Sequence, residues 1–176
     1  MFKMIEPVVR LYRRLDPVFG YAQTGFLLAV RLYWGFQFAQ DGWGKLTHLS
    51  RVAEFFASLN LPAPGATALF VALVEFAGGI LFALGLGSRL VSLVLFINMT
   101  MAYLSIPDDR INFSHILSSP SDFYNATPYT YWFAALLILV FGPGRFAVDT
   151  LLSRAHGFSA PTLVRAQVSQ PGRLDK

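Results

Sequence analysis

Three polar residues that could carry chemistry lie near the middle of long apolar runs: Arg31, Glu75 and Asn98. An ionisable side chain at the centre of a bilayer costs roughly 2.5–3.5 kcal/mol to insert, so it needs a partner inside the protein. We therefore predict an Arg31–Glu75 ion pair on adjacent helices, with Asn98 hydrogen-bonded nearby. Such a pair either marks a ligand or proton site, or serves only to fix the register of the helices.

The runs that carry these residues have the length of membrane helices. They cover about 21–40, 66–84, 90–106 and 128–141 of the 176 residues, and about 20 residues are needed to cross a bilayer. Only 14% of the residues are charged, against about 25% in soluble domains. The sequence therefore predicts an all-α integral membrane four-helix bundle. It excludes a soluble enzyme and a nucleic-acid-binding domain, although the isoelectric point is about 9.6.

Lysine and arginine are distributed unevenly between the two sides of this bundle. Ten of the 14 lie before the first run, after the second or beyond the fourth, and three lie on the opposite side. The positive-inside rule then predicts that both termini are cytoplasmic. We expect a multi-pass protein of a bacterial-type plasma (inner) membrane.

The chain is expected to form a single domain over residues 1–156, followed by a flexible cytoplasmic tail over 157–176. Residues 1–20 have an amphipathic pattern, typical of a helix that lies on the membrane surface. These boundaries are expectations from composition and periodicity.

The two longer connections between the runs differ in pattern. The first has an apolar stripe, which predicts a short amphipathic outer helix between spans one and two; the stripe comprises Leu49, Val52, Phe56 and Leu59. The other, residues 107–127, is polar and has no helical period. We expect turns there.

In the first three runs, the polar residue shares a helix face with residues spaced three or four apart. Small residues at this spacing let packed helices approach closely. The stripes are Arg31, Gly35, Phe38, Gly42 and Lys45; Ala68, Ala72, Glu75, Gly79 and Ala83; and Val91, Leu95, Asn98, Ala102 and Ser105. We expect all three stripes to face neighbouring helices and not lipid.

Several cofactors are not expected. The chain has no cysteine, which excludes disulfides and thiolate-bound iron–sulfur clusters. None of the three histidines lies within an apolar run, so we expect no haem. The polar residues near the outer surface include Asp41, His48 and His115, but their spacing is not typical of a metal site, and we expect no metal.

The motifs resemble those of the DoxX family of small four-helix membrane proteins. The segment 31–46 is similar to the family's first-helix signature, 75–86 with Arg89 to its second block, and 142–149 to its last-helix exit. The family pattern maps onto Arg31, Gly35, Lys45, Glu75, Gly79 and Arg89. The resemblance implies a four-helix membrane fold and a link to redox systems, since the family takes its name from a membrane subunit of a quinone-linked complex.

The residues and the resemblance support two main hypotheses for function. In the first, the chain is a membrane subunit of a quinone-dependent oxidoreductase and acts as an enzyme only within that complex. Glu75 and Arg31 would be the catalytic residues, and the quinone would contact Arg31, Trp34, Phe38, Glu75 and Asn98. In the second, the chain is a scaffold or assembly factor whose Arg31–Glu75 pair is structural; a small-solute or proton pathway is a weaker alternative.

The same hypotheses indicate the partners. We expect the lipid bilayer, a redox or other membrane protein or a second copy of the chain, and no nucleic acid.

Overall fold

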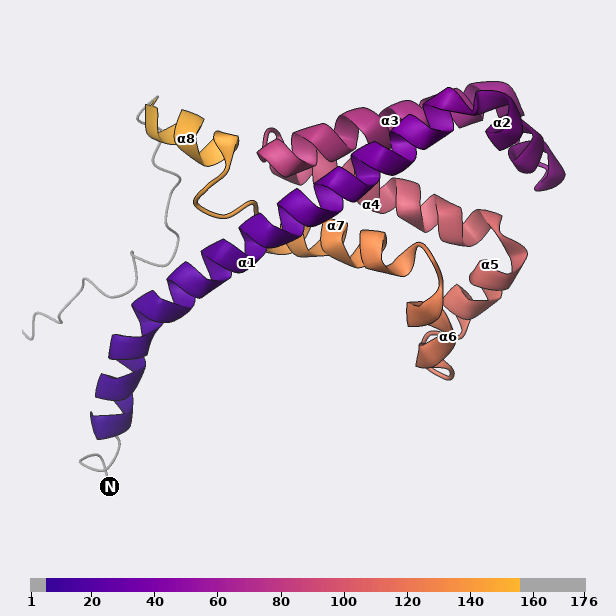
Figure 1. Cartoon of the computed structure of the whole chain (residues 1–176). Helices are drawn as coiled ribbons and strands as arrows, with labels where there is room; N and C mark the ends of the chain where they lie inside the picture. Colours follow the sequence, from indigo (N-terminus) through magenta and orange to yellow (C-terminus); the bar gives the residue numbers. More distant parts are fainter. Residues whose placement is uncertain (1–5, 156–176) are drawn as a thin grey trace, which may run out of the picture.

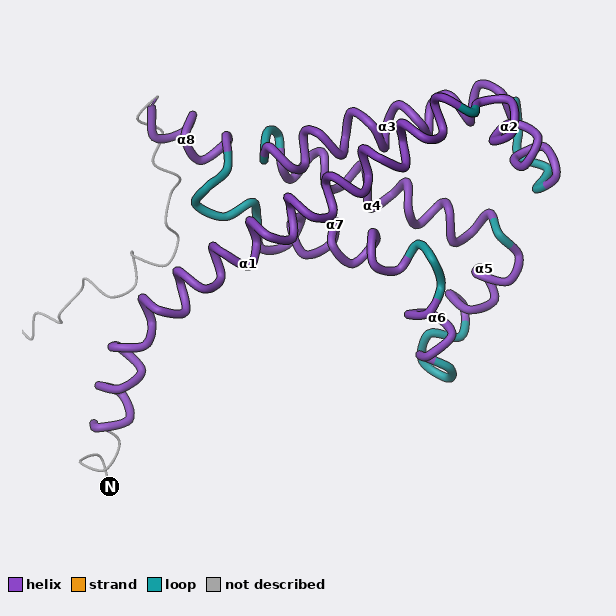
Figure 2. Tube along the Cα trace, in the orientation of Figure 1, coloured by secondary structure: helices purple, strands orange, loops and turns teal. Residues whose placement is uncertain are grey.

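A computed structural model describes the backbone of residues 6–155 and the side chains of residues 15–153 and 155. The predicted tail over 157–176 lies outside these residues. Within them every regular element is a helix and there is no strand (Figure 2), as the all-α prediction requires. The helices are α1 (Glu6–Thr47), α2 (Leu49–Ser58), α3 (Pro64–Leu84), α4 (Ser88–Ser105), α5 (Pro107–Ser114), α6 (Pro120–Asn125), α7 (Tyr129–Phe141) and α8 (Val148–Ala155).

Four of these helices pack against one another in a ring. α1 contacts α3, α3 contacts α4, α4 contacts α7, and α7 returns to α1. Figure 1 shows α2, α5 and α6 at one end of this arrangement and α8 at the other, beside the turn between α3 and α4. We refer to the two as the α2 end and the α8 end.

Among the described residues, two helices are long and apolar enough to cross a membrane, α3 with 21 residues and α4 with 18. α7 is as apolar but has only 13 residues. α1 has 42 residues, which at 1.5 Å per residue gives about 63 Å, twice the ~30 Å of a bilayer's apolar layer. Its N-terminal part extends away from the other helices (Figure 1). The helix is continuous through residue 20, where the interfacial segment 1–20 was expected to meet the first span.

α1 and α3 lie so close that backbone touches backbone. A Cβ atom added to Gly42 would lie 2.3 Å from the amide nitrogen of Phe76, and one added to Gly79 would lie 2.5 Å from that of Ala39. At Gly35 the nearest atoms belong to Ala83. These contacts confirm the small-residue stripes of the first two runs.

The stripe expected on the third run is only partly correct. α4 does bury Leu95, but the other residues that it buries are Ser88, Ser92, Met99 and Tyr103. Asn98, Ala102 and Ser105 instead line a pocket. The core of the molecule is formed by larger apolar side chains, including Leu27, Phe38, Phe82, Leu95, Met99 and Ile138. α4 packs mainly on α7, so the position of α7 decides which face of α4 is buried.

The two connections at the α2 end are both helical. α2 confirms the expected amphipathic helix after the first run. The connection 107–127 was expected to lack helices, and this was wrong, because it contains α5 and α6. Each of these helices begins with a proline, Pro107 or Pro120, whose fixed φ suits the first helical turn. They escape periodicity analysis because they are one to two turns long.

Candidate functional site

The predicted Arg31–Glu75 ion pair does not form. Arg31 donates from Nη2 to the carbonyl oxygen of Phe146 at 2.9 Å, whereas Glu75 is bonded to Lys45 and Asn98. The reason is the antiparallel register of α1 and α3. Since Gly42 contacts Phe76 and Gly35 contacts Ala83, Arg31 lies level with Gly85 at the C-terminal end of α3, about three turns beyond Glu75.

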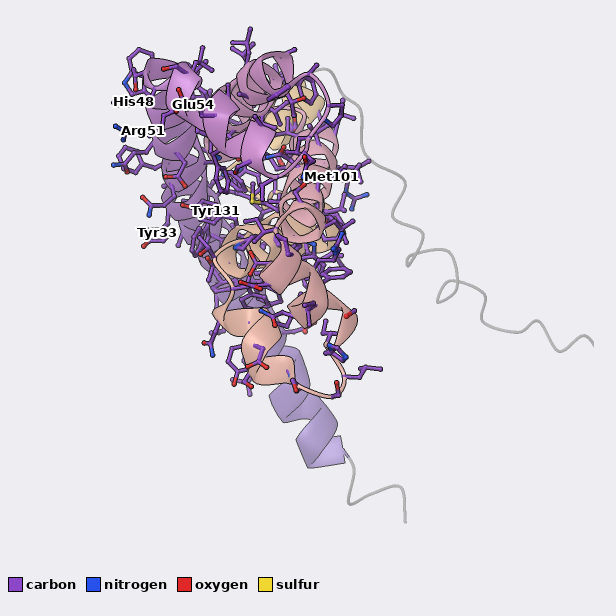
Figure 3. All side chains as sticks on the ribbon, turned by 90° about the vertical axis from the view of Figure 1, so that its right-hand side faces the viewer. Tyr33, His48, Arg51, Glu54, Met101 and Tyr131 are labelled. Atoms are coloured by element: carbon purple, nitrogen blue, oxygen red, sulfur yellow. The ribbon has the colours of Figure 1, made fainter. Side chains whose placement is uncertain are left out.

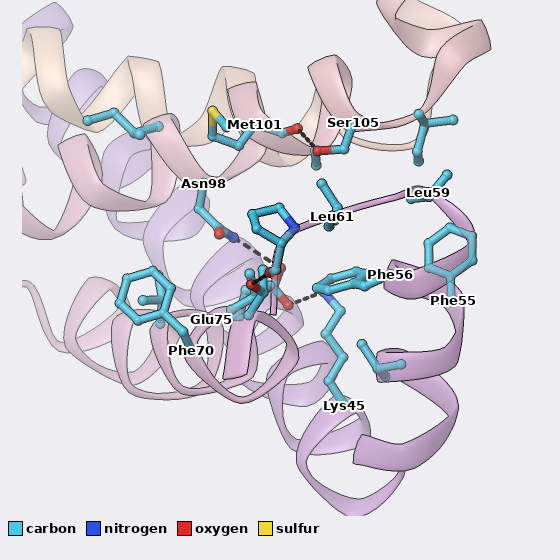
Figure 4. Close-up of a pocket in the computed structure, with 18 of the residues that line it drawn as sticks. Lys45, Phe55, Phe56, Leu59, Leu61, Phe70, Glu75, Asn98, Met101 and Ser105 are labelled. Atoms are coloured by element: carbon cyan, nitrogen blue, oxygen red, sulfur yellow. Dashed lines mark hydrogen bonds and ion pairs between the residues drawn. The ribbon is translucent and has the colours of Figure 1, made fainter. Parts of the chain in front are cut away.

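Glu75 lies at the centre of a polar cluster built from three helices. Lys45 of α1 donates to its Oε2 atom and forms an ion pair with it. The Nδ2 atom of Asn98, from α4, donates to Oε1 at 3.1 Å. The Glu75 side chain is 3% exposed and that of Lys45 is 32% exposed. The cluster therefore joins a buried carboxylate to a partly exposed lysine side chain, and Figure 4 shows the contacts of Glu75 with Lys45 and Asn98.

This cluster lies in a largely apolar pocket of about 770 Å³ between α2, α3 and α4, whose other polar lining residues are Arg51, Thr67 and Ser105 (Figure 4). The volume lies within the range of small-molecule sites, about 300–1,000 Å³. Aromatic side chains from α2 and α3 contribute much of the wall: Phe55, Phe56 and Phe70. On α4, three residues that line the pocket are also 41–55% exposed: Val94, Ile97 and Met101. The pocket is therefore open on the outer side of α4.

Two predicted ligand residues, Trp34 and Phe38, lie elsewhere. Phe38 is fully buried and packs edge-on against Phe82 at 6.2 Å and Tyr131 at 4.9 Å between ring centroids. Trp34 packs against the same tyrosine at 5.1 Å. Neither residue lines the pocket. Together they form an aromatic contact between α1 and α7.

Sequence reasoning missed two contributors to the pocket. Lys45 belonged to the expected stripe of the first run, but it was not assigned to Glu75. The α2 residues were expected only to form an outer helix, whereas Phe55 and Phe56 cover the pocket. The apolar stripe of α2 was the available signal, because a short amphipathic helix needs something to cover.

The other polar residues of the α2 end make local contacts. Tyr131 donates its hydroxyl hydrogen to Asp41. His48 Nδ1 lies 3.0 Å from the Gly44 carbonyl oxygen, one turn earlier in α1. Figure 3 views the molecule from this end, with His48, Arg51 and Glu54 on the outside. Within the described part of the chain, no three His, Cys, Asp or Glu residues group as metal ligands would.

A second polar cluster fastens α8 to the turn between α3 and α4. Asp149 accepts hydrogen bonds from the amides of Gly87 and Ser88, both at 2.7 Å, and from the Ser88 hydroxyl at 2.8 Å. Burial alone would raise the pKa of Asp149, but these bonds and the nearby Arg31 outweigh it and hold the pKa below its usual range. Asp149 thus caps α4 from 61 residues further along the chain.

Arg31 belongs to this second cluster and is only 1% exposed. Its Nη1 atom lies so close to Gly85 that a Cβ atom there would be 1.7 Å away. Its Nε and Nη1 atoms have no hydrogen-bond acceptor among the described residues. Arg31 therefore holds the α7–α8 connection and is not part of the Glu75 pocket.

Comparison with family models gives a match to the DoxX family over residues 26–108. This confirms the resemblance for the motifs at 31–46 and 75–89, whereas the motif at 142–149 lies outside the match. The matched segment includes Lys45, Glu75 and Asn98, and also α3 and α4, the two described helices that are long and apolar enough to span a membrane. Comparisons with curated proteins and with solved structures gave no match.

Proposed function

We propose that this membrane protein, whose residues 26–108 belong to the DoxX family, binds a quinone in the pocket that contains Glu75 and serves as the membrane subunit of a redox complex. The observation that carries the proposal is the cluster of Lys45, Glu75 and Asn98 within an apolar pocket of about 770 Å³. A buried ionisable group beside a cavity is a frequent mark of a functional site in membrane proteins.

The lining suits the two parts of a quinone. Its ring carbonyls are hydrogen-bond acceptors, and Asn98 and Lys45 are donors. Its ring and isoprenoid tail are apolar, as are the aromatic residues Phe56 and Phe70 on the pocket wall. The open side along α4 faces the lipid phase, in which quinones dissolve. A bound quinone supplies two-electron chemistry, since it takes up two electrons and two protons to become a quinol.

The chain's own residues would handle the proton. Glu75 would take up and release a proton at its carboxylate, which forms an ion pair with Lys45. Lys45, in the last turn of α1 with a side chain that is 32% exposed, would relay protons between the buried carboxylate and the surface at the α2 end. Asn98 fixes the position of Oε1 from the other side. The electrons come from, or go to, a flavin- or metal-containing partner protein.

The membrane arrangement that fits this role has α1, α3, α4 and α7 as four spans. Arg89 and Arg145 lie at the α8 end, so the positive-inside rule assigns that end to the cytoplasm of a bacterial-type inner membrane. Protons from the quinone site would then exchange at the outer surface through Lys45. A redox protein, another membrane protein or a second copy of the chain completes the complex.

One observation favours the alternative, a scaffold without chemistry. Both carboxylate oxygens of Glu75 already have partners within the chain. A fully bonded buried pair can serve only to fix helix register. A scaffold would need no ligand in the pocket.

Binding of a short-chain quinone to the purified full chain in detergent tests the proposal. We expect one quinone to bind per chain. Asn98→Leu should lower the affinity about tenfold, because a hydrogen bond to a charged or polar ligand group is worth about 1–2 kcal/mol. Asn112→Leu, on α5 and outside the pocket lining, is the matched control and should bind as the unchanged protein does.

A second pair of variants tests the carboxylate. Glu75→Gln should keep quinone binding but abolish proton transfer in the intact complex, while Glu54→Gln, exposed on α2 (Figure 3), should change neither. Quinone binding that is absent, or equal in Asn98→Leu and Asn112→Leu, would overturn the proposal. The scaffold would then be the better explanation.

A further inference from the structure

A second cleft, of about 860 Å³, lies at the α8 end, between the N-terminal half of α1 and the connection from α7 to α8. Its lining mixes polar and apolar residues and comprises Asp16, Tyr21, Gln23, Thr24, Leu27, Arg89, Phe141, Arg145 and neighbouring residues. The cleft shares no residue with the Glu75 pocket. A ligand bound here is therefore independent of the proposed quinone site.

The cleft lies where the apolar helices end. α3 ends at Leu84, α4 begins at Ser88 and α7 ends at Phe141, all at the α8 end (Figure 1). The ends of spanning helices mark the boundary of the hydrocarbon layer, and the polar headgroups of lipids lie just beyond it. A polar cleft at this level therefore faces lipid headgroups.

Two arginines supply positive charge to the cleft. A Cβ atom on Gly142 would lie 3.9 Å from Nη2 of Arg89, so this side chain reaches from the start of α4 to the connection that carries Arg145. The Arg145 guanidinium lies 5.7 Å from the ring centroid of Tyr21. Neither arginine forms an ion pair with another residue whose side chain is described. Guanidinium groups are well suited to phosphate, since they offer paired donors in one plane.

The rest of the lining matches the other parts of a phospholipid. Leu27 and Phe141 form an apolar wall for the glycerol and the start of the acyl chains. Asp16 adds one carboxylate to the two arginines. A zwitterionic headgroup, which carries both a phosphate and an ammonium group, complements this set of charges better than a purely anionic one.

We propose that this cleft binds one phospholipid with an ethanolamine-type headgroup, the phosphate between Arg89 and Arg145 and the ammonium toward Asp16. The lipid would fill the space between α1 and the α7–α8 connection.

Native mass spectrometry of the delipidated full chain in detergent, titrated with phosphatidylethanolamine or phosphatidylglycerol, tests this. We expect one tightly bound phosphatidylethanolamine, and a loss of about tenfold in affinity for Arg89→Ala and for Arg145→Ala, because each removes a charged hydrogen bond. Arg110→Ala, exposed on α5 at the other end, is the control for general charge effects. Asp16→Asn should remove the preference over phosphatidylglycerol.

A pair of glycine variants tests the cleft without changing charge. Gly20 and Gly25 both lie on α1 with no atom within 4 Å of an added Cβ, and only Gly20 lines the cleft. Gly20→Phe should therefore block the lipid, and Gly25→Phe should not.

Three results would overturn the inference. The first is lipid binding that Arg110→Ala reduces as much as Arg89→Ala does. The second is equal binding of the two lipids by the unchanged protein, which refutes the ethanolamine assignment. The third is displacement by inorganic phosphate alone at equal concentration, which indicates a free-anion site.

Discussion

The contact between α1 and α3 at Gly42 gives the sharpest test of the structure. Gly42→Ala would place its Cβ atom 2.3 Å from the Phe76 amide nitrogen, 2.7 Å from its Cα and 2.9 Å from the Ala72 carbonyl oxygen. All three are backbone atoms, which cannot move aside as a flexible side chain can. To restore ordinary contact, the two helices must separate locally by about 1 Å, and overpacking of this kind costs about 1–3 kcal/mol.

Gly44→Ala is the matched control, two residues away on the same helix. A Cβ atom there has nothing within 4 Å. Replacing glycine by alanine within a helix stabilises it by roughly 0.5–1 kcal/mol when there is room. The two variants are therefore expected to differ by about 1.5–4 kcal/mol in free energy of unfolding, in opposite directions from the unchanged protein.

Reversible denaturation in mixed detergent micelles, followed by tryptophan fluorescence, measures this difference. Trp43 reports on the contact directly, since its ring lies 5.6 Å from that of Phe76. Separation of the helices should also weaken the Lys45–Glu75 ion pair one turn away, so quinone affinity should fall in Gly42→Ala alone. Equal stability of the two variants would refute the register of α1 and α3, and with it the assignment of Glu75 to Lys45.

Three further predictions concern charged residues. Lys45→Met should lower the free energy of unfolding by about 3 kcal/mol, because it leaves the buried Glu75 carboxylate unpaired. Glu75→Gln should lower it by about 1 kcal/mol, and the double variant by little more. A double-mutant cycle of denaturation measurements checks this, and additive losses would contradict it. Arg31→Met should change the free energy of unfolding by less than about 1 kcal/mol. The variant loses the hydrogen bond to the Phe146 carbonyl, but it also removes two buried nitrogen atoms that lack an acceptor, and the two effects offset each other. A loss above about 3 kcal/mol in the same assay would contradict this. Asp149→Asn should release α8 and speed hydrogen exchange at Ser88 by more than about tenfold, the equivalent of one charged hydrogen bond. The pKa of Asp149 is lowered in the folded protein. The contribution of Asp149 to stability is therefore complete above its unfolded pKa of about 3.9 and is lost as the pH falls through its folded pKa. Protection of the Ser88 amide from exchange that persists after the carboxylate is protonated would refute this.

The sequence correctly predicted features that depend on the residues of one helix at a time, such as its apolar length and, for the first two runs, its packing face. Apolar length predicted α3, α4 and, in part, α7, and the small residues of the first two runs predicted the close packing of α1 on α3. Asn98 and Glu75 each lie near the middle of a helix joined to the next by a short turn, so their similar depth followed from the hairpin. Their hydrogen bond is consistent with that reasoning.

The predictions that failed depend on how two helices are placed relative to each other. Arg31 and Lys45 are 14 residues apart, nearly four full turns, and so they share one face of α1. The shared face of α1 was predicted correctly, but the residue spacing does not show whether Arg31 or Lys45 lies level with Glu75. That choice depends on the register set by Gly35 and Gly42 against α3.

The bond between Asp149 and the start of α4 has a consequence for biosynthesis. The ribosome makes the chain from its N-terminus, so α3 and α4 leave it well before residue 149 does. Until then the amides of Gly87 and Ser88 lack the carboxylate that caps them. The cap of the hairpin is thus completed only by the arrival of α8, and a chain that stops short of Asp149 leaves the amides at the start of α4 without this acceptor.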